Sequence, residues 1–206
     1  MESEGGAREK RGDRGKRRQR PKAPPKASPE VLERVALAYL ARFAASEAGL
    51  KRVLMRRVDR AAQAGTVSAD EGKASVDALL GRYRRAGLLD DRAFAEARAA
   101  SLHRAGASAR AIRARLGQKG IAPDLIALAL AALGRAADGG SDLAAAVHYA
   151  RRRRLGPFAD PARRAARHDR DLAALGRQGF AFDVARQVIE AADAAAAEDL
   201  AVTPPG

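Results

Sequence analysis

The chain of 206 residues contains no cysteine and no tryptophan, and aromatic residues make up only 4% of it. Without cysteine, disulfides, thiolate zinc sites and cysteine nucleophiles are excluded. Alanine contributes much of the 47% hydrophobic content and buries little area, at a gain of roughly 25 cal/mol per Å². We therefore expect several small packing units rather than one deep core.

Long apolar runs are also missing. No segment approaches the ~18 apolar residues of a membrane span, and the charged N-terminal stretch lacks the apolar core of a signal peptide. The sequence therefore predicts a cytoplasmic protein that has no membrane partner.

Acidic residues are scarce relative to basic ones, with 25 Asp and Glu against 39 Lys and Arg, for a net charge of +14. A GC-rich genome would explain arginine in place of lysine, but not the excess of basic over acidic residues. The charge favours a polyanionic partner, such as nucleic acid.

The sequence has no motif typical of a catalytic or cofactor site. It contains no GxxxxGK[ST] loop for phosphates and no HExxH pair for a metal. Its three histidines, at positions 103, 148 and 168, are far apart, and the acidic pair Asp90–Asp91 is better explained as a helix cap. We expect no catalysis, no metal, no cofactor and no small-molecule substrate.

Apolar residues recur at three- and four-residue steps through most of the chain, which predicts an all-α fold. Residues 1–29 are the exception, because they are basic and proline-rich and have no such period. We expect them to form a disordered basic tail.

The helical part divides into three predicted units, each of three helices. The expected boundaries are 30–89, 90–137 and 138–193, followed by a frayed C-terminal tail over 194–206. Ser28, Ser108 and either Asp90 or Asp91 are predicted N-caps, a helix is expected to start at Ser46, and Gly120 is a predicted left-handed helix stop. A long loop is expected over 60–72, and a linker begins at Asp138.

An internal repeat supports this division. Leu116-Gly-Gln-Lys-Gly-Ile-Ala-Pro-Asp-Leu matches Leu175-Gly-Arg-Gln-Gly-Phe-Ala-Phe-Asp-Val at one constant offset. Tandem helical units share contacts with their neighbours, so the molecule should be an elongated, curved array. The alternative is a single helical bundle in which the similarity is a coincidence.

Arginines dominate the polar faces of these helices. Arg151–Arg154 are four in a row, more than the dipole at a helix C-terminus requires, and base-stacking aromatic residues are not interleaved with the charges. Our candidate contacts with an anionic partner are Arg84, Arg85, Arg110, Arg113, Arg115, Lys119, Arg151, Arg152, Arg153, Arg154, Arg163, Arg164 and Arg167.

Three stretches of the sequence resemble the RecX family of recombination regulators. They are Ala-Gly-Leu-Leu-Asp-Asp-Arg-Ala-Phe-Ala-Glu (86–96) with the downstream Lys119-Gly-Ile, the opening at 36–47, and Arg-Arg-Arg-Arg-Leu-Gly-Pro-Phe (151–158). The turn Gly106-Ala-Ser departs from the Gly-x-Gly usual in the family. The residues of the motif that we expect to be structural are Gly87, Leu88, Leu89, Asp90, Asp91, Phe94 and Gly120.

The resemblance implies a monomeric protein of tandem three-helix repeats that lies along the groove of the RecA filament on single-stranded DNA. Such a protein inhibits the ATPase, strand exchange and coprotease activities of RecA, and so regulates DNA repair, homologous recombination and the SOS response. Double-stranded DNA is a further expected partner. The alternative is a generic nucleic-acid-binding protein that acts through its N-terminal arm and arginine-rich helices.

Overall fold

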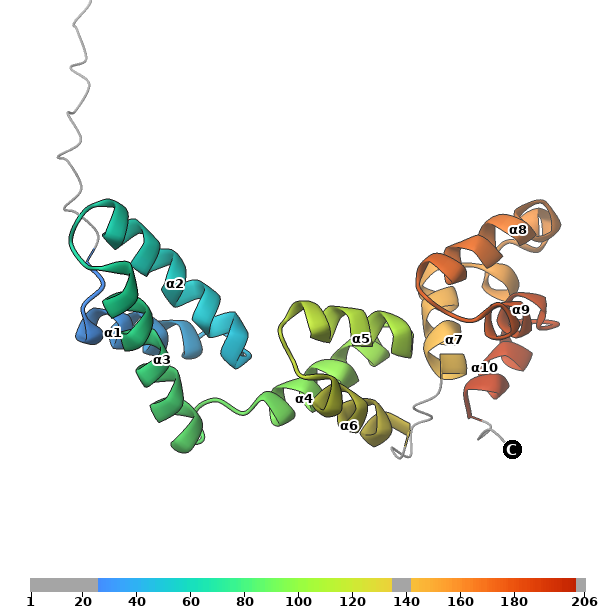
Figure 1. Ribbon diagram of the computed structural model, residues 1–206. Coiled ribbons are helices and arrows are strands. Elements are labelled where there is room, and N and C mark those ends of the chain that lie inside the picture. Colours follow the sequence, from blue (N-terminus) through green and yellow to red (C-terminus); the bar gives the residue numbers. More distant parts are fainter. Residues whose placement is uncertain (1–25, 135–141, 203–206) are drawn as a thin grey trace, which may run out of the picture.

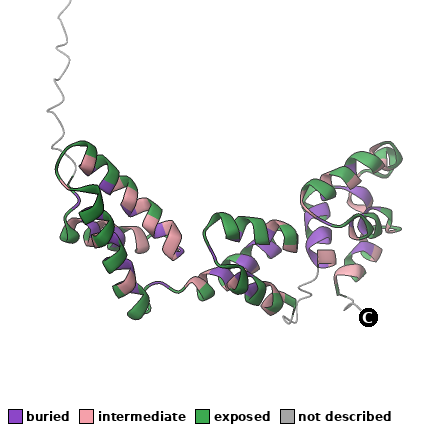
Figure 2. Ribbon diagram, viewed as in Figure 1, coloured by how far each residue is buried: buried purple, intermediate pink, exposed green. Residues whose placement is uncertain are grey.

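The computed structural model describes residues 26–134 and 142–202, and every regular element within them is helical. The helices form three groups that follow one another along an elongated, bent array (Figure 1). Buried residues gather inside each group, and exposed residues cover its outside (Figure 2). The predicted all-α array of tandem units is therefore confirmed. None of these helices is both long enough and apolar enough to cross a membrane.

The first unit contains α1 (Pro29–Leu40), α2 (Glu47–Gln63) and α3 (Ala69–Arg85). Leu50, Leu54 and Val58 lie one turn apart on α2 and are fully buried. This spacing places them on one face of the helix. They pack against residues of α1 and α3 in a single apolar cluster, which includes Leu32, Ala36, Val76, Leu79, Leu80 and Tyr83.

The expected long loop over 60–72 is wrong, because α2 continues to Gln63 and α3 begins at Ala69. Ser68 and Glu71 form a capping box at the start of α3. In such a box the N-cap and the fourth residue satisfy each other's backbone N–H groups. The polar composition of this stretch therefore reflects a helix start rather than an extended loop.

The second unit contains α4 (Asp91–Arg104), α5 (Ala109–Gln118) and α6 (Pro123–Gly134). Ala95 and Ala99 are fully buried on α4, and α4 packs closely against α6. Asp90 is the N-cap of α4 and accepts a hydrogen bond from the Ala93 N–H at 2.9 Å. Gly120 follows α5 with a φ of 82°, which confirms the predicted left-handed stop.

The third unit contains α7 (Asp142–Arg153), the short 3-10 turn η1 (Gly156–Phe158), α8 (Pro161–Arg177), α9 (Phe182–Glu190) and α10 (Ala194–Val202). Its core joins α7, α8 and α9 through residues such as Val147, Leu175, Val188 and Ile189.

The predicted frayed tail over 194–206 is wrong for residues 194–202, because these form α10. Asp193 accepts a hydrogen bond from the Ala196 N–H at 2.9 Å, as an N-cap does. The helix packs on α7, Ala197 is fully buried, and Glu198 forms an ion pair with Arg151 at 3.0 Å. Alanine has the highest helix propensity, so an alanine-rich end favours a docked helix.

The predicted disordered tail over 1–29 is wrong for residues 26–29, which the structure describes. Residues 1–25 and the linker over 138–140 lie outside the described residues. Ala27, however, is buried in the core of the first unit, and the Lys26 carbonyl accepts a hydrogen bond from Arg57 at 2.7 Å. Ser28 precedes α1 but makes no capping bond. Its hydroxyl donates instead to the Glu30 carboxylate at 2.7 Å.

Two short hydrogen bonds connect the first unit to the second, beside a longer one of 3.4 Å from Arg52 to the Lys119 carbonyl. The Ser46 hydroxyl caps α2 and also donates to the Lys119 carbonyl at the end of α5, at 2.7 Å. The Glu47 N–H, in the first turn of α2, donates to the Asp91 carboxylate at 2.8 Å. The ends of α2, α4 and α5 therefore satisfy one another's polar groups, which would otherwise lack partners.

The same pair of bonds connects the second unit to the third. The Ser108 hydroxyl caps α5 and donates to the Gln178 carbonyl at the end of α8, at 2.8 Å. The Ala109 N–H donates to the Asp142 carboxylate at 2.7 Å. Gly106, with a φ of 75°, lies so close to Tyr149 that a Cβ there would be 2.9 Å from the Tyr149 backbone nitrogen. We call each Ser–carbonyl and Asp–amide pair an inter-unit joint.

Substitution of Ser108 by alanine should weaken the second joint. Loss of the cap costs about 0.5–2 kcal/mol, and a carbonyl left without its partner costs about 1–3 kcal/mol more. We expect S108A to lower the free energy of unfolding in urea by roughly 2–4 kcal/mol. Small-angle X-ray scattering should also show a changed radius of gyration under native conditions.

The matched control is S68A. Ser68 also begins a helix, but its partner Glu71 belongs to that same helix. S68A should cost only about 1 kcal/mol and leave the radius of gyration unchanged. Equal effects of the two substitutions would show that Ser108 acts only as a cap.

Candidate functional site

Four arginines line a hollow between α7 and α8 in the third unit. The hollow has a volume of about 460 Å³, and Arg153, Arg167, Arg170 and Arg177 are in its wall. Tyr149, Leu155, Ala174 and Gln178 are there too, and Asp171 is the only acidic residue of the wall. We call this feature the arginine hollow, and its wall carries a formal excess of positive charge.

Asp171 lines this hollow and is almost fully buried. One carboxylate oxygen accepts a hydrogen bond from the Gly156 N–H at 2.9 Å. The other lies 3.7 Å from the Arg167 Nε, and within the described residues neither of these two atoms has a hydrogen-bond partner. Asp171 therefore fixes η1 against α8 and also orients Arg167.

The Tyr149 ring holds two more guanidinium groups in place. The guanidinium carbons of Arg152 and Arg153 lie 5.8 and 6.0 Å from the ring centroid. Contacts of this kind are favourable because the face of an aromatic ring is electronegative. Tyr149 thus orients part of the Arg151–Arg154 run, and all four of these arginines are exposed.

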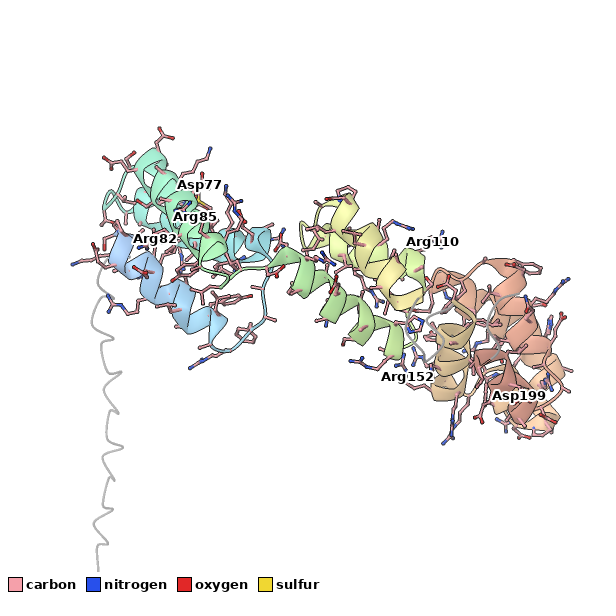
Figure 3. All side chains as sticks on the ribbon, turned by 90° about the horizontal axis from the view of Figure 1, so that it is seen from below. Asp77, Arg82, Arg85, Arg110, Arg152 and Asp199 are labelled. Carbon is pink, nitrogen blue, oxygen red and sulfur yellow. The ribbon has the colours of Figure 1, made fainter. Side chains whose placement is uncertain are left out.

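The other predicted contact residues are distributed along the array. Arg85 in the first unit, Arg110 in the second and Arg152 in the third lie in successive units (Figure 3). Arg84 forms an ion pair with Glu47 at 3.5 Å, next to the first joint. Lys119 ends α5, where its carbonyl takes part in that joint. The structure thus brings Arg153 and Arg167 together in one hollow and places Arg152 beside Arg153 on the Tyr149 ring. Arg113 and Arg115 are exposed on α5 of the second unit.

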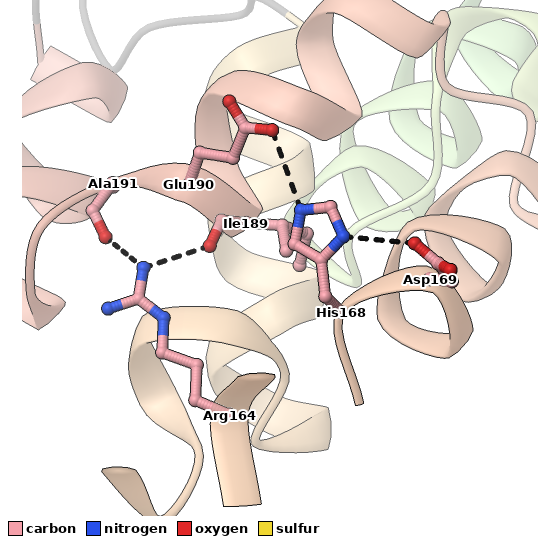
Figure 4. A network of polar contacts seen from close by, with 6 residues as sticks. All are labelled: Arg164, His168, Asp169, Ile189, Glu190 and Ala191. Carbon is pink, nitrogen blue, oxygen red and sulfur yellow. Dashed lines mark hydrogen bonds and ion pairs between the residues drawn. The ribbon is translucent and has the colours of Figure 1, made fainter. Parts of the chain in front are cut away.

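Arg163 and Arg164, like Arg151 and Arg167, already have partners inside the third unit. Arg164 donates to the backbone carbonyls of Ile189, Ala191 and Ala192, and so caps the end of α9 (Figure 4). Arg163 lies 3.9 Å from Asp160, which caps α8. Arg164 therefore has a clear structural role in this unit.

His168 lies beside Arg164 in the same network (Figure 4). Its ring nitrogens contact the Asp169 carboxylate at 3.0 Å and the Glu190 carboxylate at 3.5 Å. The bond with Asp169 is the main reason that the pKa of His168 is raised above its ordinary value of 6.5, and Glu190 acts in the same direction. The protonated imidazole would strengthen the contact between α8 and α9.

Sequence reasoning did not include Arg170 and Arg177 among the candidate contacts, although both line the arginine hollow. A signal was present, because Arg167, Arg170, Ala174 and Arg177 recur at three- and four-residue steps and so share one face of α8. The partner face on α7 could not be identified from that spacing alone.

The residues of the family motif lie where the first unit meets the second. Gly87 has a φ of 70° after α3, and Leu89 is buried. Asp90 caps α4, whereas the Asp91 carboxylate accepts the Glu47 N–H hydrogen bond of the first joint. Phe94 is half-buried, and Leu88 remains 53% exposed.

Leu88 belongs to a second, apolar hollow of about 600 Å³ between α1 and α4. Leu37 and Phe43 also line it and are about half exposed. Exposed apolar surface rimmed by polar residues often marks a contact with another protein. The array therefore presents an apolar hollow at the first joint and a basic one near the second.

Within the described ranges, no three His, Asp or Glu side chains gather in a group able to hold a metal ion. Asp90 and Asp91, the acidic pair noted in the sequence, bind backbone N–H groups instead.

Comparison with known proteins gives two kinds of match. The family model for RecX, second three-helix domain, matches residues 90–130, which cover α4, α5 and most of α6. The chain is 43% identical over 184 residues to "Regulatory protein RecX" of Myxococcus xanthus (strain DK1622), covering 88% of this chain and 97% of that protein.

A second relative is "Regulatory protein RecX" of Agrobacterium fabrum (strain C58 / ATCC 33970). It is 34% identical over 101 residues, covering 49% of this chain and 51% of that protein. The match to the Myxococcus protein extends over nearly its whole length, so the similarity includes all three units. The chain therefore belongs to the RecX family of regulatory proteins.

Proposed function

We propose that this protein binds the RecA filament on single-stranded DNA and inhibits its ATPase, strand exchange and coprotease activities. In this role it regulates DNA repair and recombination without catalysing a reaction itself. The observation that carries the proposal is the distribution of exposed arginines over three units that are linked by repeated joints. Membership of a family of regulatory proteins supports it.

A filament is a regular polymer of protein and phosphate groups, so a partner that follows it needs contacts at successive positions. Exposed arginines occur in each unit, for example Arg85, Arg113 and Arg152. The joints made by Ser46 and Ser108 limit the motion of one unit relative to the next. The array could therefore contact several positions along a filament without first ordering its units, which lowers the entropic cost of binding.

Inhibition of RecA would follow if this protein bridged neighbouring RecA subunits of the filament. A body that contacts neighbouring RecA subunits would oppose the subunit motions on which ATP hydrolysis and disassembly depend. Leu37, Phe43 and Leu88 around the apolar hollow supply surface for a protein contact, and the arginines supply contacts with phosphates or carboxylates.

The direct test is a titration of the single-strand-dependent ATPase of RecA from the same organism. We expect strong inhibition well below one molecule of this protein per RecA subunit, because each molecule would span several subunits. No inhibition, together with tight salt-sensitive binding to DNA alone, would contradict the proposal. That result would favour the generic nucleic-acid-binding alternative.

Charge reversal at Arg152 and Arg153 should weaken this inhibition. Both side chains are exposed and are oriented by Tyr149, so R152E/R153E should retain helicity by circular dichroism while requiring more protein for half-inhibition.

The matched control for R152E/R153E is R98E/R186E. It changes the net charge equally at two exposed arginines that have no ion pair or hydrogen bond within the described residues. Equal effects of the two double variants would mean that net charge, and not the position of Arg152 and Arg153, governs inhibition.

A further inference from the structure

We propose that the arginine hollow binds phosphate groups in the backbone of a nucleic-acid strand, without regard to base sequence. This inference deepens the proposed function and rests on it, because it assigns the DNA contact of the filament to one site in the third unit. The site is the hollow between α7 and α8 lined by Arg153, Arg167, Arg170 and Arg177.

The positive charge of the hollow is only partly compensated. Arg170 and Arg177 line it, and neither has an ion pair or a hydrogen bond within the described residues. The carboxylate of Asp171 is directed to the Gly156 N–H and to Arg167. Two guanidinium groups of the wall are therefore available to an anion from outside.

Arg167 is oriented within the hollow by the buried carboxylate of Asp171. Its Nε is buried 3.7 Å from Asp171, too far for a hydrogen bond, and has no other partner within the described residues. Asp171 thus orients the Arg167 side chain, which lines the hollow, where its guanidinium can bind the oxygens of an anion.

Guanidinium groups favour phosphate as the anion. The planar arginine side chain donates two parallel hydrogen bonds to the oxygens of a phosphate. Several arginines around one hollow of about 460 Å³ suit one or two phosphate groups.

Tyr149 explains why the base would not be recognised. It is the aromatic residue of the wall, but its side chain is only 7% exposed and already contacts Arg152 and Arg153. Base-stacking sites need an open aromatic face. The hollow can therefore bind the phosphates of a nucleic-acid backbone through its positive charge, but it has no exposed aromatic face on which a base could stack.

The surface around the hollow favours a strand over a free phosphate ion. Gly179, next to the wall residue Gln178, lies against Arg110 of the second unit, and a Cβ on Gly179 would be 3.1 Å from the Arg110 Nε. Arg113, also exposed, follows one turn later on α5. Basic side chains thus continue from the hollow across the second joint, as a polymer with repeated charges requires.

The test measures the affinity of the full chain for a fluorescein-labelled oligo-dT by fluorescence anisotropy, over a range of salt concentrations and without RecA. R170Q/R177Q should bind more weakly than the original protein. The slope of log affinity against log salt should fall by about 0.7 for each phosphate group that the variant no longer neutralises. R98Q/R186Q, which removes the same charge outside the hollow, should change both quantities much less.

Three outcomes would overturn the inference. One is equal weakening by both double variants, which would indicate a general effect of charge. Another is unchanged binding by R170Q/R177Q. The third is displacement of the oligonucleotide by orthophosphate at an equal phosphate concentration, since the hollow would then be a site for a single free anion.

Failure of this inference can be distinguished from failure of the proposed function. The oligonucleotide experiment contains no RecA, and the ATPase titration of the unmodified protein does not depend on the hollow being the DNA contact. If the unmodified protein inhibits RecA but R170Q/R177Q binds DNA as well as it does, the hollow is not the DNA site. The proposed function as a RecA regulator would still stand.

Discussion

The hydrogen bonds between units hold the three helical units in one array. Each unit buries a small core made partly of alanine, and such a core gives little stability on its own. Ser46 and Ser108 each cap a helix and also bind the end of a helix in the next unit. Asp91 and Asp142 each accept an N–H group from the preceding unit. Helix ends leave backbone N–H and C=O groups without a partner inside the helix. Hydrogen bonds to these groups join the three units, each with a small core, into one array.

The second joint also connects the architecture to the proposed DNA contact. Gln178 accepts the Ser108 hydrogen bond through its carbonyl and also lines the arginine hollow. Tyr149, which orients Arg152 and Arg153, packs against Gly106 of the second unit. In the proposed complex, a strand bound in the hollow would therefore contact a surface whose position relative to the second unit is already set.

Local features were predictable from the sequence, and contacts between distant segments were not. Ser108, Asp90 and Gly120 could be assigned because capping and left-handed stops depend on a few neighbouring residues. The second partners of Ser46 and Ser108 lie 73 and 70 residues away, and no local pattern identifies them. Helix α10 was missed because an alanine-rich, acidic end lacks an amphipathic period. Arg164 was predicted as a contact because it belongs, with Arg163 and Arg167, to a set of closely spaced arginines on one helix. The structure shows that it instead caps the end of α9.

In the proposed complex the whole array lies along the RecA filament, with the arginine hollow at the DNA. A cryo-electron microscopy reconstruction of RecA filaments on single-stranded DNA, saturated with this protein, tests it most directly. We expect density for all three units in the filament groove, with α7 and α8 of the third unit against the DNA backbone. Density for one unit only, or for molecules confined to filament ends, would contradict it.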